Sequence, residues 1–103
     1  MNVLVIDVGG TKVKILATGQ DTPRKLPSGP DLTAAQMVAE VVQAAAGWEY
    51  EVVSVGYPGP VLRGRPVSDP VNLGPGWVGF DFAAAFGRPV KLVNDAAMQA
   101  LGS

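Results

Sequence analysis

A short apolar run near the start of the chain, Val3 to Ile6, most constrains the fold, because an acid and a pair of glycines follow it. The run is rich in β-branched residues and too short for a typical helix, which predicts a strand buried on both faces. Gly9-Gly10 gives a two-residue turn signal, and Thr11 to Leu16 alternates lysines with apolar residues as a half-exposed strand does. We therefore expect a hairpin whose bend gathers the Asp7 carboxylate, glycine amides, a hydroxyl and an ammonium group. Such a bend can hold a phosphate chain and its metal.

The middle of the chain predicts an edge strand, a helix and a second apolar strand. Thr22 to Leu26 is a short strand that its proline confines to a sheet edge. Thr33 and Gln36 have the spacing of a capping box, and Gly47 is the expected C-cap of the helix that they begin. Val52 to Tyr57 is rich in valine and predicts a strand.

The last part of the chain begins with a long segment, Pro58 to Gly79, that is rich in glycine and proline and has no periodicity. A connection of this length inside a compact domain is usually functional or disordered, and its Trp77 argues against disorder. Beyond it we expect a short helix between Asp81 and Gly87, an apolar strand and a final helix. Their ranges are Phe82–Phe86, Pro89–Val93 and a segment that starts at Asp95.

The element order is thus β-β-β-α-β-α-β-α, which predicts an α/β fold with a mixed five-stranded sheet. The first, fourth and fifth strands are expected to be parallel, because helices connect them as right-handed crossovers. At 103 residues the chain has the length of one domain.

Composition excludes several classes of function. The chain has no cysteine and no histidine, so thiolate or histidine zinc sites and His-dependent triads cannot come from it. Its formal net charge is −1 without a basic patch along the sequence, which argues against nucleic acid as a partner. No apolar stretch reaches the length needed to span a membrane, and we expect a cytoplasmic protein.

Polar or glycine-rich residues follow each of the three strands that are expected to be parallel. They are Asp7 to Gly10, Tyr57 to Pro60, and Asn94-Asp95. Ligands gather at this edge of an open α/β sheet, so the convergence predicts a binding site. Each motif alone also has a plainer interpretation. Gly9-Gly10 can be a simple turn, Lys12 a solvated strand lysine, Asp95 a helix N-cap, Tyr57 to Pro60 a rigid turn, and Asn72 and Trp77 pins of the long loop.

Taken together, four motifs resemble those of one family. They are Asp7-Val-Gly-Gly-Thr-Lys12, Gly56-Tyr-Pro-Gly-Pro-Val61, Asn72-Leu-Gly-Pro-Gly-Trp77 and Asn94-Asp-Ala-Ala-Met-Gln-Ala-Leu-Gly102. In this order they resemble the ROK group of sugar kinases, especially its glucokinase and polyphosphate-glucokinase branch, in the actin-like ATPase superfamily. The resemblance implies a ribonuclease-H-like fold and transfer of a phosphoryl group to a hexose, with glucose favoured.

The resemblance also implies roles for individual residues. Asp95 would be the general base that accepts the proton of the sugar hydroxyl, and Asp7 would orient Mg²⁺. The sugar contacts implied are Gly59, Asn72, Asn94 and Asp95. The phosphate contacts implied are Gly9, Gly10, Thr11 and Lys12, and the donor would be ATP or polyphosphate.

Kinases of this group have two lobes, and this sequence matches the motifs of the first. Residues 1–103 are therefore expected to be an N-terminal lobe or a truncated form, inactive or weakly active alone. Apolar surface left exposed where a second lobe packs would favour a homo-oligomer or another association. The alternative is a non-catalytic sugar-binding module. A sugar-responsive repressor is disfavoured because no helix-turn-helix segment precedes Met1, and a dinucleotide site is disfavoured because a strand, not a helix, follows Gly9-Gly10.

Overall fold

The computed structural model describes residues 1–9, 12–29, 31–59, 61–62, 65–66, 74 and 76–94. Within these ranges it contains two helices, a five-stranded sheet and a small two-stranded sheet. In chain order the elements are β1 (Val3–Val8), β2 (Lys12–Ala17), β3 (Arg24–Pro27), α1 (Ala34–Ala44), β4 (Val52–Tyr57), β5 (Val61–Leu62), β6 (Arg65–Pro66), α2 (Phe82–Phe86) and β7 (Val90–Asn94).

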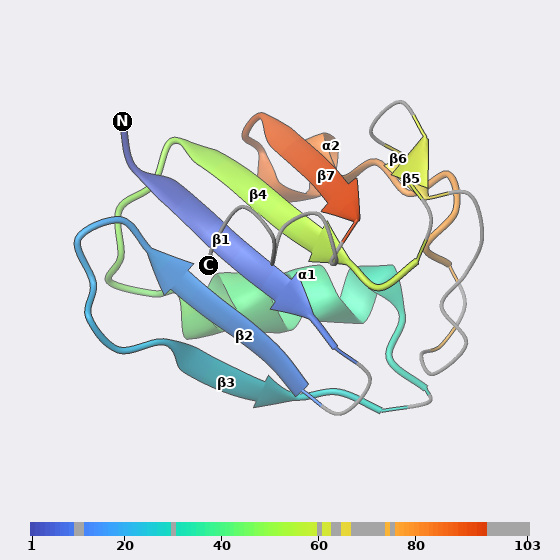
Figure 1. Ribbon diagram of the computed structural model, residues 1–103, viewed down its shortest axis with the longest axis horizontal. Helices are drawn as coiled ribbons and strands as arrows, with labels where there is room; N and C mark the ends of the chain where they lie inside the picture. Colours follow the sequence, from blue (N-terminus) through green and yellow to red (C-terminus); the bar gives the residue numbers. More distant parts are fainter. Residues whose placement is uncertain are drawn as a thin grey trace.

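The main sheet has the strand order β3-β2-β1-β4-β7 (Figure 1). β2 pairs antiparallel with β1 and with β3, whereas β4 pairs parallel with β1 on one side and with β7 on the other. The predicted mixed sheet with three parallel strands is therefore confirmed. The final helix expected after Asp95 lies outside the described residues.

Both described helices cover the same face of this sheet. α1 contacts α2, and Figure 1 shows α1 behind the strands. On that face Leu4, Ile6 and Val8 of β1 are 0% exposed, whereas Val5 on the opposite face is 36% exposed. The prediction that β1 is buried on both faces is wrong. Right-handed crossovers that proceed in the same direction along a sheet, as from β1 to β4 and from β4 to β7, place their helices on the same face of the sheet. No described helix covers the opposite face.

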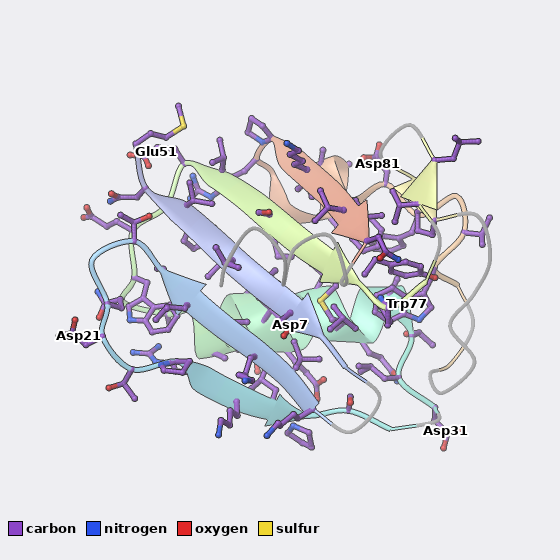
Figure 2. All side chains as sticks on the ribbon, in the orientation of Figure 1. Asp7, Asp21, Asp31, Glu51, Trp77 and Asp81 are labelled. Atoms are coloured by element: carbon purple, nitrogen blue, oxygen red, sulfur yellow. The ribbon has the colours of Figure 1, made fainter. Side chains whose placement is uncertain are left out.

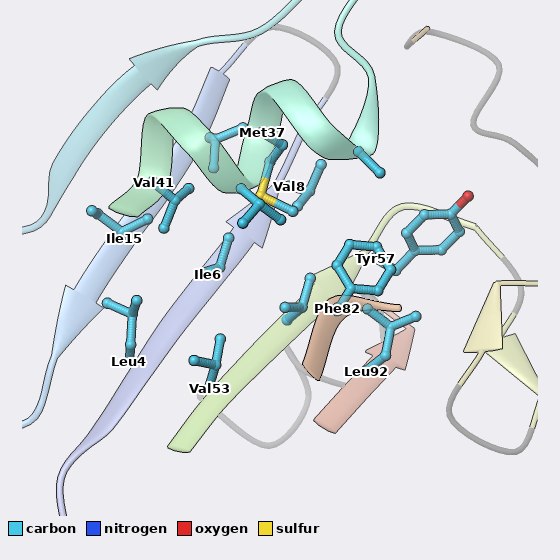
Figure 3. Close-up of a cluster of buried hydrophobic side chains, with 14 of the residues drawn as sticks. Leu4, Ile6, Val8, Ile15, Met37, Val41, Val53, Tyr57, Phe82 and Leu92 are labelled. Carbon is cyan, nitrogen blue, oxygen red and sulfur yellow. The ribbon is translucent and has the colours of Figure 1, made fainter. Parts of the chain in front are cut away.

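The core fills the space between the sheet and the helices (Figure 3). Met37 and Val41 of α1 are fully buried, and Phe82 of α2 is nearly so. Full burial of one such side chain contributes about 1.5–3 kcal/mol. The strand residues that complete this core include Leu4, Ile6, Val8, Val13, Ile15, Val53, Val55, Tyr57 and Leu92.

The start of α1 confirms the predicted capping box. The Thr33 hydroxyl accepts a hydrogen bond from the Gln36 backbone N–H at 3.2 Å, and the Gln36 side-chain oxygen accepts one from the Thr33 N–H at 3.1 Å. Two of the four N–H groups that every helix leaves without a partner in its first turn are thereby satisfied.

The end of α1 differs from the prediction, because the C-cap is Ala45 and not Gly47. Arg24 of β3 reaches the helix end, where its guanidinium donates to the carbonyls of Ala44 and Ala46 and stacks 4.1 Å from the centre of the Trp48 ring. A side chain that is distant in sequence thus satisfies the last carbonyls. Gly47 has a φ of +90° and redirects the chain after the helix.

The structure differs from the prediction at two further places, the start of β3 and the connection after β4. β3 begins at Arg24 and ends at Pro27, so it starts two residues later than the expected strand over Thr22 to Leu26. The long connection after β4 was expected to have no regular structure, yet β5 and β6 pair antiparallel within it. Strands of two residues carry too little periodicity to be recognised in a sequence.

No helix within the described ranges is long and apolar enough to cross a membrane.

Replacing Thr33 by alanine should lower the free energy of unfolding by about 1 kcal/mol, because the N-cap acceptor of α1 is lost. Urea denaturation followed by circular dichroism measures the change. Thr22→Ala is the matched control, since Thr22 is an exposed threonine outside helices and strands. An equal loss in both variants would contradict a capping role for Thr33.

Candidate active site

The carboxyl ends of β1, β4 and β7 meet in one row. The strand register places Asp7 beside Gly56 and Gly56 beside Val93, and one residue further it places Tyr57 beside Asn94. Neighbouring strands are about 4.8 Å apart, so groups on β1 and β7 lie about 10 Å apart across β4. The expected convergence of three strand ends at one sheet edge is confirmed by this register.

Gly9 closes the hairpin between β1 and β2. Its N–H donates to the Lys12 carbonyl at 3.0 Å. Gly10, the second residue of the predicted Gly9-Gly10 turn, lies outside the described ranges. A Cβ on residue 9 would lie 2.9 Å from the Lys12 carbonyl oxygen, so glycine is required for this close approach.

A hydroxyl from the loop after β3 braces the same bend. Ser28, which is half-buried, donates from its Oγ to the Gly9 carbonyl at 2.8 Å. The sequence showed only a loop at this position and gave no signal for the contact. Ser28 therefore ties the turn of the hairpin to the third strand.

Asp7 and Lys12 lie on the sheet face that the described helices leave uncovered. Asp7 is half-buried, Lys12 is exposed, and Figure 2 shows Asp7 near the carboxyl end of β1. Among the described residues no group of three or more histidine, cysteine or acidic side chains is arranged to hold a metal. Mg²⁺ is commonly bound through one or two carboxylates together with phosphate oxygens and water. A lone Asp7 fits this ion when a phosphate donor completes its coordination.

Two residues expected to contact a sugar are joined directly. The side-chain amide of Asn94, at the end of β7, donates to the Gly59 carbonyl at 2.7 Å, in a partly buried position. The contact links the end of β7 to the turn that follows β4. Both positions are thereby held at the same edge as Asp7.

Gly59 rests on an aromatic cluster. A Cβ at this position would lie 3.0 Å from a ring carbon of Tyr57, which is itself fully buried. The Tyr57 ring is 5.8 Å from that of Trp77, and Trp77 is 6.2 Å from Phe82 of α2. The turn after β4 therefore lies on a rigid base that is continuous with the core.

Trp77 also fixes the end of the long loop to the start of α1. Its indole N–H donates to the Leu32 carbonyl at 3.2 Å, and the Gly74 N–H donates to the same oxygen at 2.8 Å. A Cβ on Gly74 would lie 2.6 Å from the Asp31 carbonyl oxygen, so this contact also needs glycine. The plainer interpretation of Trp77, that it pins the long loop, is confirmed, and Figure 2 shows its side chain beside the end of β4.

The remaining candidate residues lie outside the described ranges. Sequence analysis did not identify Ser28, Gly74 or Tyr57 as supports of the site. Gly74 stands inside the third motif and could have been found there, whereas the packing of Tyr57 beneath Gly59 depends on tertiary structure. The candidates outside the described ranges are Gly10, Thr11, Asn72 and Asp95.

Several solved structures that this chain resembles are ROK family proteins or sugar kinases. A ROK hexokinase from Thermus thermophilus is 30% identical with a TM-score of 0.77, and the match covers 98% of this chain and 37% of that one. A ROK family protein from Streptococcus pneumoniae TIGR4, in complex with sucrose, is 25% identical with a TM-score of 0.75, over 98% of this chain and 37% of that one. A protein from Listeria monocytogenes, described as a candidate N-acetylmannosamine kinase, is 25% identical with a TM-score of 0.72, over 99% and 38%.

The chain belongs with the ROK sugar kinases and corresponds to their N-terminal part. It spans between a third and two-fifths of the length of these structures. No protein-family model and no curated protein sequence matches it significantly. The ROK assignment therefore rests on the fold, together with the four motifs in their order.

Gly59→Ala should lower the free energy of unfolding by about 1–3 kcal/mol, because the added methyl group has no space above the buried Tyr57 ring. Urea denaturation measures the loss. Gly29→Ala is the control, since a Cβ at Gly29 meets nothing within 4 Å. The packing account is wrong if the two variants are equally stable.

Proposed function

We propose that residues 1–103 form the acceptor-binding lobe of a sugar kinase that transfers a terminal phosphoryl group to a hexose hydroxyl. The observation that carries the proposal is the hydrogen bond between Asn94 and Gly59. It joins two motif residues at the sheet edge where Asp7 and the β1–β2 hairpin also end. Structural neighbours that are sugar kinases support this reaction class.

On the acceptor side, Gly59 and Asn94 would hold the sugar together with Asn72 and Asp95. Asp95 follows Asn94 directly in the chain, and the contact with Gly59 holds Asn94 at this edge. As the general base, Asp95 would accept the proton of the attacking hydroxyl while that oxygen forms its bond to phosphorus. A positioned base of this kind contributes about 10²–10⁴-fold to the rate. Glucose, through its 6-hydroxyl, is the favoured acceptor.

On the donor side, the β1–β2 hairpin would hold the phosphates of ATP or polyphosphate. The Gly9 N–H already donates to the Lys12 carbonyl, so Gly9 would let the phosphates come close to the backbone because it has no side chain. Gly10 and Thr11 would donate hydrogen bonds to the phosphates from their N–H groups and the threonine hydroxyl. Lys12 would add positive charge, and Asp7 would hold Mg²⁺, which neutralises charge on the phosphates when bound. Positioning and charge neutralisation account for most of the catalysis in phosphoryl transfer.

In this proposal, the remaining contacts with the phosphoryl donor come from polypeptide outside residues 1–103. Alone, the chain would bind a hexose and transfer phosphate slowly or not at all. A non-catalytic sugar-binding module is the second candidate, because the acceptor side is the better supported half of the site.

Asp95→Asn should lower hexose phosphorylation by about 10²–10⁴-fold when the complementary C-terminal part of a ROK kinase is supplied. Asparagine keeps the size and one hydrogen-bonding oxygen of aspartate but cannot take the proton. Product formation with glucose and ATP, and separately with polyphosphate, measures the effect. Asp21→Asn is the matched control, since Asp21 lies in an exposed turn before β3.

The assay separates the two candidates. Undiminished transfer by Asp95→Asn would remove Asp95 from the role of base. Glucose binding by calorimetry without any transfer, in the presence of the second part, would contradict the kinase and favour the module.

A further inference from the structure

Both polar groups of the Gly9 backbone are held by hydrogen bonds. Its N–H donates to the Lys12 carbonyl at 3.0 Å, and its carbonyl accepts from the Ser28 hydroxyl at 2.8 Å. The first bond joins the two strands of the hairpin to each other. The second comes from a half-buried side chain that lies 19 positions further along the chain, in the loop after β3. The hairpin bend is therefore held from outside as well as from within.

The Ser28 hydroxyl is placed by the strand that precedes it and by the turn that follows it. Pro27, the last residue of β3, pairs with Lys12 at the start of β2, so Ser28 comes one residue beyond the terminal pair of these two strands. On the other side, the Gly29 carbonyl accepts a hydrogen bond from the Leu32 N–H at 3.1 Å. The hydroxyl thus reaches the bend from a backbone that is fixed before and after it.

The carbonyl that Ser28 holds belongs to the peptide group between Gly9 and Gly10. A trans peptide is planar, and its C=O and N–H point in opposite directions. A hydrogen bond that fixes the carbonyl therefore also sets the direction of the N–H in the same group. Because glycine stands on both sides of this peptide, its rotation meets little steric resistance, and a contact is needed to hold its orientation.

We infer that Ser28 is a positioning residue for the phosphoryl donor, which acts through the Gly9 carbonyl. The inference rests on the proposed function, in which the Gly10 N–H donates to a phosphate chain. With the hydroxyl in place, the carbonyl oxygen faces Ser28 and the N–H of the same peptide is directed away from it, toward the donor. Without the hydroxyl, the peptide can rotate and turn the partial negative charge of its oxygen toward the phosphates. Ser28 does this without touching the donor.

A brace that serves stability alone is the other interpretation of this bond, and the opposite end of β1 offers a comparison. There the Thr18 hydroxyl accepts from the Val3 N–H at 2.9 Å and donates to the Val3 carbonyl at 3.4 Å. Thr18 follows β2 directly, so its hydroxyl also ties β1 to a neighbouring segment. Loss of either hydroxyl removes a contact of β1, but only the loss of Ser28 should change donor binding.

Ser28→Ala should weaken the binding of a phosphate chain about fivefold, as expected for the loss of a single hydrogen bond. The probe is inorganic tripolyphosphate with Mg²⁺, and the backbone amide resonances of residues 1–103 report the affinity during titration. Ser28→Thr keeps a hydroxyl on the same Cβ atom and should retain the original affinity. Thr18→Ala is the matched control and should bind tripolyphosphate as tightly as the original chain, although it too loses a contact of β1.

The same variants can be assayed for hexose phosphorylation when the complementary C-terminal part of a ROK kinase is supplied. Ser28→Ala should raise the KM for the donor about fivefold and leave the KM for glucose unchanged. ATP and polyphosphate are tested separately, because both present a phosphate chain to the hairpin. An increase with either donor supports the inference and identifies the donor that the hairpin binds, whereas an increase with neither overturns it.

Equal affinity of Ser28→Ala and the original chain for tripolyphosphate would overturn the inference. So would an equal loss in Ser28→Ala and Thr18→Ala, or the absence of shifts at Gly9 and Lys12 when tripolyphosphate is added to the original chain. Failure of the proposed function gives a different result. A chain whose phosphate binding depends on Ser28, but which forms no hexose phosphate with the second part, would contradict the kinase and leave the role of Ser28 in phosphate binding in place.

Discussion

The site depends on the central position of β4. This strand pairs in parallel with β1 on one side and with β7 on the other. The carboxyl ends of β1 and β7, which carry the motif residues Asp7 and Asn94, therefore lie beside the carboxyl end of β4. Its last residue, Tyr57, is fully buried and supports the turn that carries Gly59. Without this buried ring the Gly59 carbonyl would not be held where Asn94 can donate to it.

The Leu32 carbonyl extends this support to the helical layer. It accepts one hydrogen bond from the backbone of Gly74 and one from the side chain of Trp77, and so ties the long loop to the residue that precedes the N-cap of α1. Because Trp77 also packs against Tyr57, the start of α1, the loop and the end of β4 form one rigid unit. The two described anchors of the long connection, Gly74 and Trp77, are buried.

Much of the fold could be predicted because local signals agreed with the final packing. The capping box of Thr33 and Gln36, the N-cap Asp81 and the left-handed Gly87 are short-range features that a sequence displays directly. The burial of β1 was misjudged because an apolar run does not reveal which face receives helices, a property that the direction of the crossovers decides. Contacts such as Arg24 with the end of α1, or Ser28 with Gly9, join residues far apart in sequence and have no local signal.

The central claim, that the edge holding Gly59 and Asn94 binds a hexose, is tested most directly by following the amide resonances of the chain during titration with glucose. The account predicts saturable shifts at the Gly59 backbone amide and at the Asn94 side-chain amide, with Gly29 and the residues of α1 unchanged. Shifts that are absent at both groups, or that occur elsewhere on the chain at saturation, would contradict it.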